Sequence, residues 1–276
     1  MRKHACDSFL RRMSLIALAL LGFVASVVAS VTGGSSLITV PVLMLSGMAP
    51  ANAVATNMLV LTSLSAGAAA RFRKAGTIPR QPTLGLVALS VPGSMLGALF
   101  AVRMNEDFLR GVVAVAMVAM TLLILLQPDF GLRPRVSSRR RRIWGYAVLG
   151  VWSIYGGMFS GGYATALTMG CTALLGLPLL DSVAVTRVVN LAGSLAATLV
   201  FVSQGKVYWT IGSAMSLAAL GGGWVGAHLA LRWGPQTVRR LLFISTVLLS
   251  GKLLYDVVRA HSSVRRTPRE LAPNQE

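Results

Sequence analysis

The segment Thr32–Leu37 reads TGGSSL, and the segment Ser160–Thr165 in the second half of the chain reads SGGYAT; each places a glycine pair inside a long apolar stretch. A short apolar run, an Ala-Thr or Val-Thr step and a Gly-xxx-Gly-Ala motif follow each pair in the same order, and matched positions stay 128 to 130 residues apart. Internal repeats of this length in an apolar chain indicate a fold built by duplication. The sequence therefore predicts two tandem repeats.

Long uncharged stretches place the chain in the membrane class. Hydrophobic residues make up 54% of the chain, and the mean hydropathy is +0.68. No Asp, Glu, Lys or Arg occurs in the ranges 13–70, 81–102, 111–127, 143–180 and 207–231. A helical crossing of a bilayer takes about 20 apolar residues. We therefore predict an all-α polytopic membrane protein and exclude a soluble globular one.

The second apolar segment of each half decides the predicted number of crossings. Segments 35–48 and 163–177 would form about 21 Å of helix, which is too short for a hydrocarbon core of about 30 Å. We therefore predict about four transmembrane helices and one short re-entrant segment or half-helix in each repeat, with the two repeats parallel in topology. The alternative is ten crossings in two inverted five-helix repeats.

Basic residues set the predicted orientation and the division of the chain. The net charge is +18, and 20 of the 26 Lys and Arg residues lie in the termini, in ranges 71–80 and 133–142, and at Lys206. Such runs between apolar segments indicate cytoplasmic loops that contact anionic lipids, and no nucleic-acid partner is expected. The predicted parts are a cytoplasmic N-terminus (1–12), a first transmembrane repeat (13–127), a cytoplasmic linker (128–142), a second repeat (143–258) and a cytoplasmic C-terminal tail (259–276).

The glycine pairs are candidate site residues. Irregular backbone at membrane depth is tolerated only where protein buries it or where it lines a watery cavity. A helix that begins at Gly33, Gly34, Gly161 or Gly162 would point unpaired amides and the positive end of its dipole toward a ligand, which suits an anion, and Ser35 would add a hydroxyl donor. The alternative is that these glycines only permit close helix packing.

Arg187 is the strong base within an apolar segment, and Asn57 is its match in the first half. A charge at this depth costs a few kcal/mol unless it faces the interior or reaches the interface, so it indicates a functional residue. Together with Thr56, Thr186 and Asn190 it would form a shell for a small oxyanion. Alternatively, Arg187 reaches the interface and the two Asn side chains join helices.

The sequence offers little for catalysis. It has no paired carboxylates, His/Cys cluster or nucleophile beside a base, so we expect no enzyme, catalytic residue, metal or cofactor. Cys6 and Cys171 lie in a basic terminus and an apolar segment, and no disulfide is expected. No Asp or Glu lies deep in an apolar segment, so a carboxylate proton relay has no carrier.

Across about residues 13 to 258 the chain resembles the sulfite exporter TauE/SafE family. The residues that carry this resemblance are Gly33–Pro41, Gly47–Pro50, Ala55–Asn57, Arg71–Gly76, Val185–Asn190 and Gly205–Val207. The resemblance implies a bacterial inner-membrane permease with about eight crossings that moves small sulfur-containing anions such as sulfite or organosulfonates, often outward.

These inferences combine into one expected mechanism. A small anion would be held near the midplane between the glycine pairs, would contact Arg187, Asn57 and Asn190, and would be released by rocking of one repeat against the other. The alternatives are a transporter of a neutral or cationic metabolite and a membrane scaffold that transports nothing. The sequence leaves a homo-oligomer open.

Overall fold

Helices account for nearly all of the chain that this computed structural model describes, which comprises residues 15–45, 47–109, 111–112, 115 and 138–264. Among these residues, α4, α5, α9 and the part of α10 from Trp209 to Gly234 are long and apolar enough to cross a membrane. The predicted all-α polytopic class is therefore confirmed. In chain order the helices are α2 (Leu15–Thr32), α3 (Ser36–Leu45), α4 (Pro50–Lys74), α5 (Arg80–Arg103), α7 (Arg139–Met158), α8 (Tyr163–Leu175), α9 (Leu179–Ser203) and α10 (Trp209–Val264), which joins two helices at Gly234.

Glycines and caps set the helix ends that matter for the site. Gly33 follows α2 with φ 81°, and Gly162 precedes α8 with φ 75°. These left-handed angles strain other residues, so the helix is interrupted at both pairs. The helices after the interruptions are short, because α3 has 10 residues and α8 has 13. At about 1.5 Å per residue, neither can cross a core of about 30 Å.

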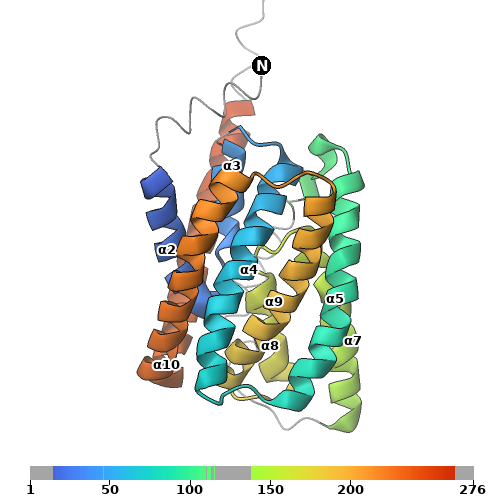
Figure 1. Ribbon diagram of the computed structural model, residues 1–276, viewed down its shortest axis with the longest axis vertical. Helices are drawn as coiled ribbons and strands as arrows, with labels where there is room; N and C mark the ends of the chain where they lie inside the picture. Colours follow the sequence, from blue (N-terminus) through green and yellow to red (C-terminus); the bar gives the residue numbers. More distant parts are fainter. Residues whose placement is uncertain (1–14, 46, 110, 113–114, 116–137, 265–276) are drawn as a thin grey trace, which may run out of the picture.

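Matched helices of the two halves run in opposite directions. In Figure 1, α2, α4 and the first part of α10 descend, whereas α5, α7 and α9 ascend. Hydrogen bonds between α4 and α9 agree, since Ser65 bonds to Asn190 while the earlier Thr62 bonds to the later Ser194 and Thr198. The predicted parallel topology is therefore wrong. The alternative prediction, in which the two repeats are inverted, agrees with these directions.

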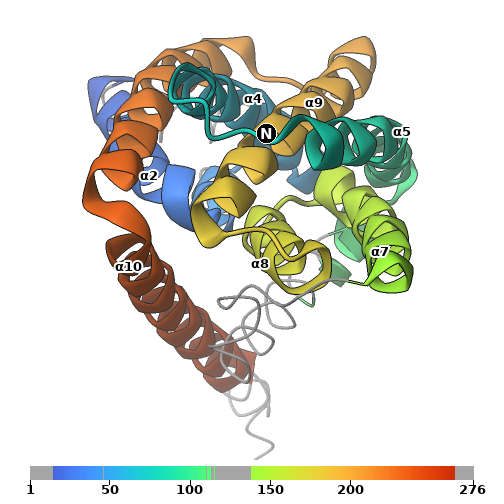
Figure 2. The same ribbon diagram turned by 90° about the horizontal axis from the view of Figure 1, so that it is seen from below.

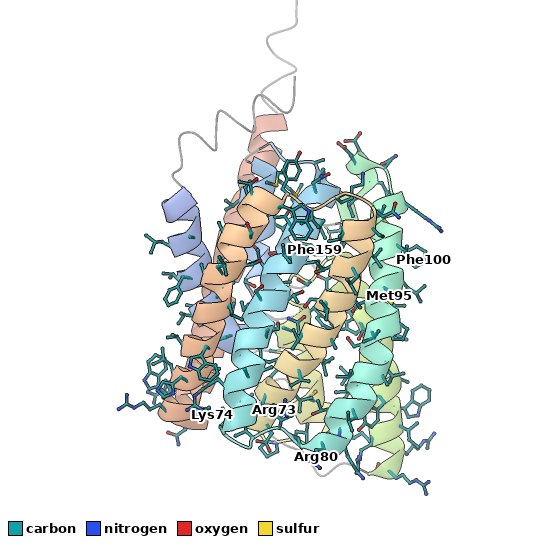
Figure 3. The ribbon with its side chains drawn as sticks, viewed as in Figure 1. Arg73, Lys74, Arg80, Met95, Phe100 and Phe159 are labelled. Atoms are coloured by element: carbon teal, nitrogen blue, oxygen red, sulfur yellow. The ribbon has the colours of Figure 1, made fainter. Side chains whose placement is uncertain are left out.

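The assignment of every basic run to one side explains this error. Keeping the basic N-terminus and the run 139–142 on the same side required an even number of crossings in each half. The structure places the start of α2 and the α9–α10 turn, which holds Lys206, at the end opposite to the run 139–142 (Figure 1). The positive-inside rule is a bias over many loops and does not fix the side of each one. We call the end that holds the start of α7 the basic end, and Figure 3 labels Arg73, Lys74 and Arg80 there. The basic end carries Arg71, Arg73, Lys74, Arg80, Arg139, Arg140, Arg141, Arg142 and Arg232.

Glycines hold the helices in two bundles, each of which mixes the two halves (Figure 2). A Cβ atom at Gly97 of α5 would fall on the carbonyl oxygen of Ile154 of α7. A Cβ atom at Gly226 of α10 would likewise fall on the carbonyl oxygen of Val27 of α2. The Gly-xxx-Gly motifs therefore pack helix backbones together. The first bundle contains α2, α4 and the first part of α10, and the second contains α5, α7 and α9.

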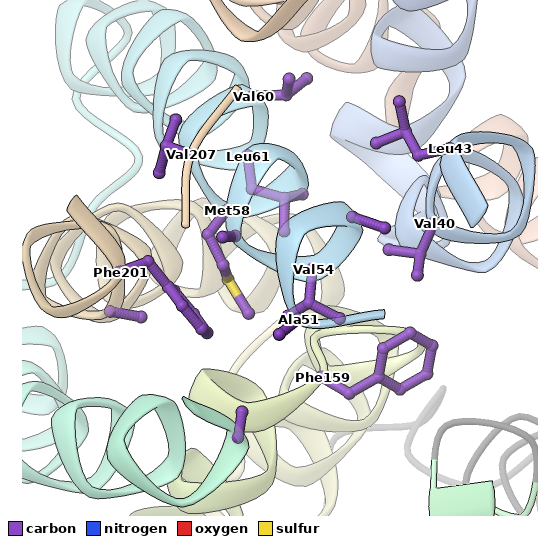
Figure 4. Close-up of a cluster of buried hydrophobic side chains, with 14 of the residues drawn as sticks. Val40, Leu43, Ala51, Val54, Met58, Val60, Leu61, Phe159, Phe201 and Val207 are labelled. Atoms are coloured by element: carbon purple, nitrogen blue, oxygen red, sulfur yellow. The ribbon is translucent and has the colours of Figure 1, made fainter. Parts of the chain in front are cut away.

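A buried apolar cluster joins the two bundles toward the end opposite to the basic end. It includes Val40 of α3, Met58 of α4, Phe159 after α7 and Phe201 of α9 (Figure 4). A smaller cluster, which includes Phe72 of α4 and Val183 of α9, lies toward the basic end. The α4–α9 contact therefore has apolar packing at both of its ends.

Candidate functional site

The two chain interruptions meet inside the protein. A Cβ atom at Gly33 would lie 2.7 Å from the backbone nitrogen of Thr165, and the Thr165 hydroxyl donates to the carbonyl oxygen of Thr32 at 2.5 Å. The hydroxyls of Ser36 and Ser160 lie 2.7 Å apart. Gly34, Ser35, Gly161 and Gly162 are buried in the same region. The amino-terminal ends of α3 and α8, with their positive dipole ends, are therefore brought together.

Asn57 joins this contact through its amide group. Its Nδ2 donates to the Ser36 hydroxyl at 2.9 Å, and its Oδ1 accepts from the Thr39 hydroxyl. Sequence reasoning missed Thr39 and Ser160. A signal existed for one of them, because Thr39 stands 18 positions before Asn57 and Thr168 stands 18 positions before Thr186. Both pairs are hydrogen-bonded.

The two predicted threonines have local partners. The Thr56 hydroxyl accepts from the backbone nitrogen of Tyr208 at 3.1 Å, so it satisfies an amide beside the start of α10. The Thr168 hydroxyl of α8 donates to the Thr186 hydroxyl of α9 at 3.0 Å. Thr56 thus secures the α9–α10 turn, whereas Thr186 links the short helix α8 to the helix that carries Arg187.

Arg187 is fully enclosed. Its side chain is 1% exposed, and its Nε and Nη2 atoms have no hydrogen-bond partner among the described residues. Among the residues whose burial the structure describes, no Asp or Glu is buried. Three positions further along α9, Asn190 donates through Nδ2 to the Ser65 hydroxyl of α4 at 3.0 Å. A buried guanidinium with unpaired donors is a costly arrangement that a bound anion would relieve.

Asn57 and Arg187 lie too far apart for one small anion to touch both. Since Ser65 pairs with Asn190 and the two helices are antiparallel, Arg187 lies level with Ala68 of α4. Asn57 is eleven positions before Ala68, or about 16 Å along the helix axis. The structure therefore brings Asn57 to the glycine pairs and places Arg187 beside Asn190, nearer the basic end.

We expect Asn57→Ala to lower the stability of the fold. The substitution removes the amide bonds to the buried hydroxyls of Ser36 and Thr39, and each lost bond is worth about 0.5–1.5 kcal/mol. The midpoint of thermal unfolding in detergent measures the effect. Asn52→Ala, at a half-buried position of the same helix, is the control. Equal midpoints for the two variants would show that the cluster contributes nothing.

The described fold and this buried cation define a multi-pass membrane protein with a polar interior, and comparison with known proteins assigns its family. Residues 18–253 match the family model for the sulfite exporter TauE/SafE. The chain belongs to this family, as the resemblance indicated.

Curated relatives carry the names of transporters. The chain is 31% identical to the "Probable membrane transporter protein YfcA" of Escherichia coli strain K12, over 82% of this chain and 84% of the relative. It is 27% identical to a "Probable membrane transporter protein" of Haemophilus influenzae, over 85% and 92% of the two chains. It is 24% identical to YunE of Bacillus subtilis, another "Probable membrane transporter protein", over 88% and 98%. No solved structure matches.

Proposed function

We propose that this protein is a permease that moves a small anion, such as sulfite, an organosulfonate or a related sulfur oxyanion, out of a bacterial cell across the inner membrane. The observation that carries the proposal is Arg187, which is buried and has two donor nitrogens without a partner among the described residues. A guanidinium can donate to two oxygens of one oxyanion at once, and this geometry suits a sulfur oxyanion.

The electrostatics of the interior favour the same class of substrate. The amino-terminal ends of α3 and α8 meet at Gly33 and Thr165, so the interior has a second positive region, about 16 Å along α4 from the level of Arg187. The residues whose burial the structure describes contribute no buried carboxylate that would neutralise this charge or bind a coupling cation. An anion is thus the ligand that this interior would stabilise.

We infer that the basic end faces the cytoplasm, in line with the positive-inside rule, and that it contacts anionic lipids there. The start of α2 then lies on the outer side, because α2 begins at the opposite end (Figure 1). The second part of α10 ends on that side as well (Figure 1), so this revises the expectation of cytoplasmic N- and C-termini; residues 1–14 and 265–276 themselves lie outside the described chain. With a negative cytoplasm, export of each negative charge gains about 2.3 kcal/mol per 100 mV.

The halves are proposed to be inverted repeats. The Ser36–Ser160 bond of α3 has its counterpart in the bond from Thr165 of α8 to Thr32, as two-fold symmetry requires. Because each bundle contains helices of both halves, one repeat cannot rock against the other as a body. Motion between the two bundles replaces the expected rocking of repeats.

Flux measurements in proteoliposomes test the proposed function. Purified protein is reconstituted, a membrane potential is imposed, and the fluxes of sulfite, sulfate, thiosulfate and methanesulfonate are compared with those of glycerol and choline. We expect potential-driven flux of one or more of the anions and background flux of the other solutes. Flux of glycerol or choline alone would support the alternative transporter. No flux of any solute would support the scaffold.

A further inference from the structure

A row of polar side chains lies along the contact between α4 and α9 and begins at Arg187. Asn190, Ser194 and Thr198 follow Arg187 at intervals of three, four and four residues, so all four share one face of α9. This face meets α4, because Asn190 bonds to Ser65 at 3.0 Å. Thr62 of α4 bonds to Ser194 and Thr198 at 3.1 and 3.3 Å. We call these six residues the polar seam.

An aromatic side chain closes each end of the seam. Phe72 lies one turn beyond the α4 position level with Arg187 and packs with Val183 and Ala184 of α9 in one buried cluster. Phe201 lies one turn beyond Thr198 and packs with Met58 of α4 in another (Figure 4). Both Phe side chains are 0% exposed. Phe72 and Phe201 stand 129 positions apart, which is the offset between the two halves.

We propose that the polar seam is the anion's path through the protein, and that Phe72 and Phe201 are its inner and outer gates. The inference rests on the proposed function, and it moves the path from the glycine pairs to the α4–α9 contact. From Arg187 to Thr198 the seam extends eleven positions, or about 16 Å, so it covers the central half of a core of about 30 Å.

The chemistry along the seam fits stepwise passage of an oxyanion. Arg187 supplies charge near the cytoplasmic end, and the later positions supply neutral hydroxyl and amide donors. Neutral donors at the outer end of the seam bind the anion weakly enough for release, whereas a second arginine there would hold it tightly. Polar side chains that only join helices would need no charge with unpaired donors, whereas Nε and Nη2 of Arg187 lack partners among the described residues.

The two bundles meet along this seam. Contacts within each bundle bring backbone against backbone, as at Gly97 and Gly226, and separating them would open voids. The seam contact consists of a few hydroxyl and amide side chains, whose hydrogen bonds can be exchanged for bonds to an anion or to water. Small displacements of one bundle can therefore free one Phe side chain at a time.

Cysteine accessibility tests the gates without any transported solute. The reporter is Ser65→Cys at the centre of the seam, with Cys6→Ser and Cys171→Ala, in membrane vesicles of both orientations with a membrane-impermeant thiol reagent. We expect a protected thiol in this parent. Phe72→Ala should raise the reaction rate at least tenfold from the basic end alone, and Phe201→Ala should do so from the opposite end alone. Phe100→Ala, on the exposed face of α5, should change neither rate.

Unchanged rates in both gate variants, or increases from the same side, would overturn the proposal. A second measurement covers a gate variant that fails to fold. Thr62→Cys with Ser194→Cys places two thiols across the seam, where the native hydroxyls are 3.1 Å apart. Oxidation should stop potential-driven sulfite flux, and a reductant should restore it.

The matched control is a cross-link within the first bundle. Gly22→Cys with Met215→Cys would join α2 to α10, where the two Cβ positions lie 3.8 Å apart, the mean separation in disulfides. Its oxidation should leave flux intact. Flux that persists in both oxidised proteins would contradict a path along the seam. If the gate variants react faster from the expected sides but the protein shows no anion flux, the proposed substrate class is wrong and the two gates are still supported.

Discussion

Arg187→Gln should reduce potential-driven anion flux by at least one hundredfold while leaving the folded protein as stable as the parent or more stable. The guanidinium has two donors without partners among the described residues, so its removal breaks no bond of those atoms and relieves a buried charge. The anion, in contrast, loses charge-assisted hydrogen bonds worth about 1.5–3 kcal/mol each. Flux in proteoliposomes and the midpoint of thermal unfolding measure the two effects.

Two further variants sharpen this test. Arg187→Lys should retain part of the flux, because it keeps the charge and loses the two-donor geometry. Arg103→Gln, at the exposed end of α5, should retain all of it. Full flux in Arg187→Gln would contradict the proposed site. A large drop in its unfolding midpoint together with full flux would show that Arg187 stabilises the fold and does not bind the anion.

Gly223→Ala should prevent correct packing of α10 on α4. The added Cβ atom would fall on the carbonyl oxygen of Leu64 and would lie 3.1 Å from the backbone nitrogen of Ala68. Backbone atoms in the middle of a helix cannot move aside, whereas the end of a flexible side chain can. Overpacking of this kind costs about 1–3 kcal/mol or more, so we expect a lower unfolding midpoint and a low yield of monodisperse protein.

Gly221→Ala is the control two positions away. An added Cβ atom there would meet only the ring of Phe23, at 3.6 Å, which is an ordinary contact. The substitution should be neutral or stabilising by up to about 1 kcal/mol, because Ala favours a helix over Gly. If the two variants unfolded at the same temperature, close backbone packing of α4 and α10 would not hold at Gly223.

The sequence alone determined the membrane class, the two interruptions and the residue that most needs an explanation. Uncharged stretches can be explained only by a bilayer, and glycine pairs interrupt helices through their own backbone angles, as Gly33 and Gly162 do. Gly97 and Gly226 allow close helix packing because they lack a side chain. Arg187 stood out because a charge within an apolar segment is costly wherever it lies. Each of these properties belongs to a residue and its near neighbours.

Tertiary structure decided the direction of the halves and the partners of each polar group. An apolar helix has the same pattern whether it enters or leaves the membrane, so its direction depends on the number of earlier crossings. The partners of Asn57, which are Ser36 and Thr39, and the separation of Asn57 from Arg187 depend on how α3, α4 and α9 pack. Helix packing of this kind joins residues that are remote in sequence, and local patterns carry no record of it.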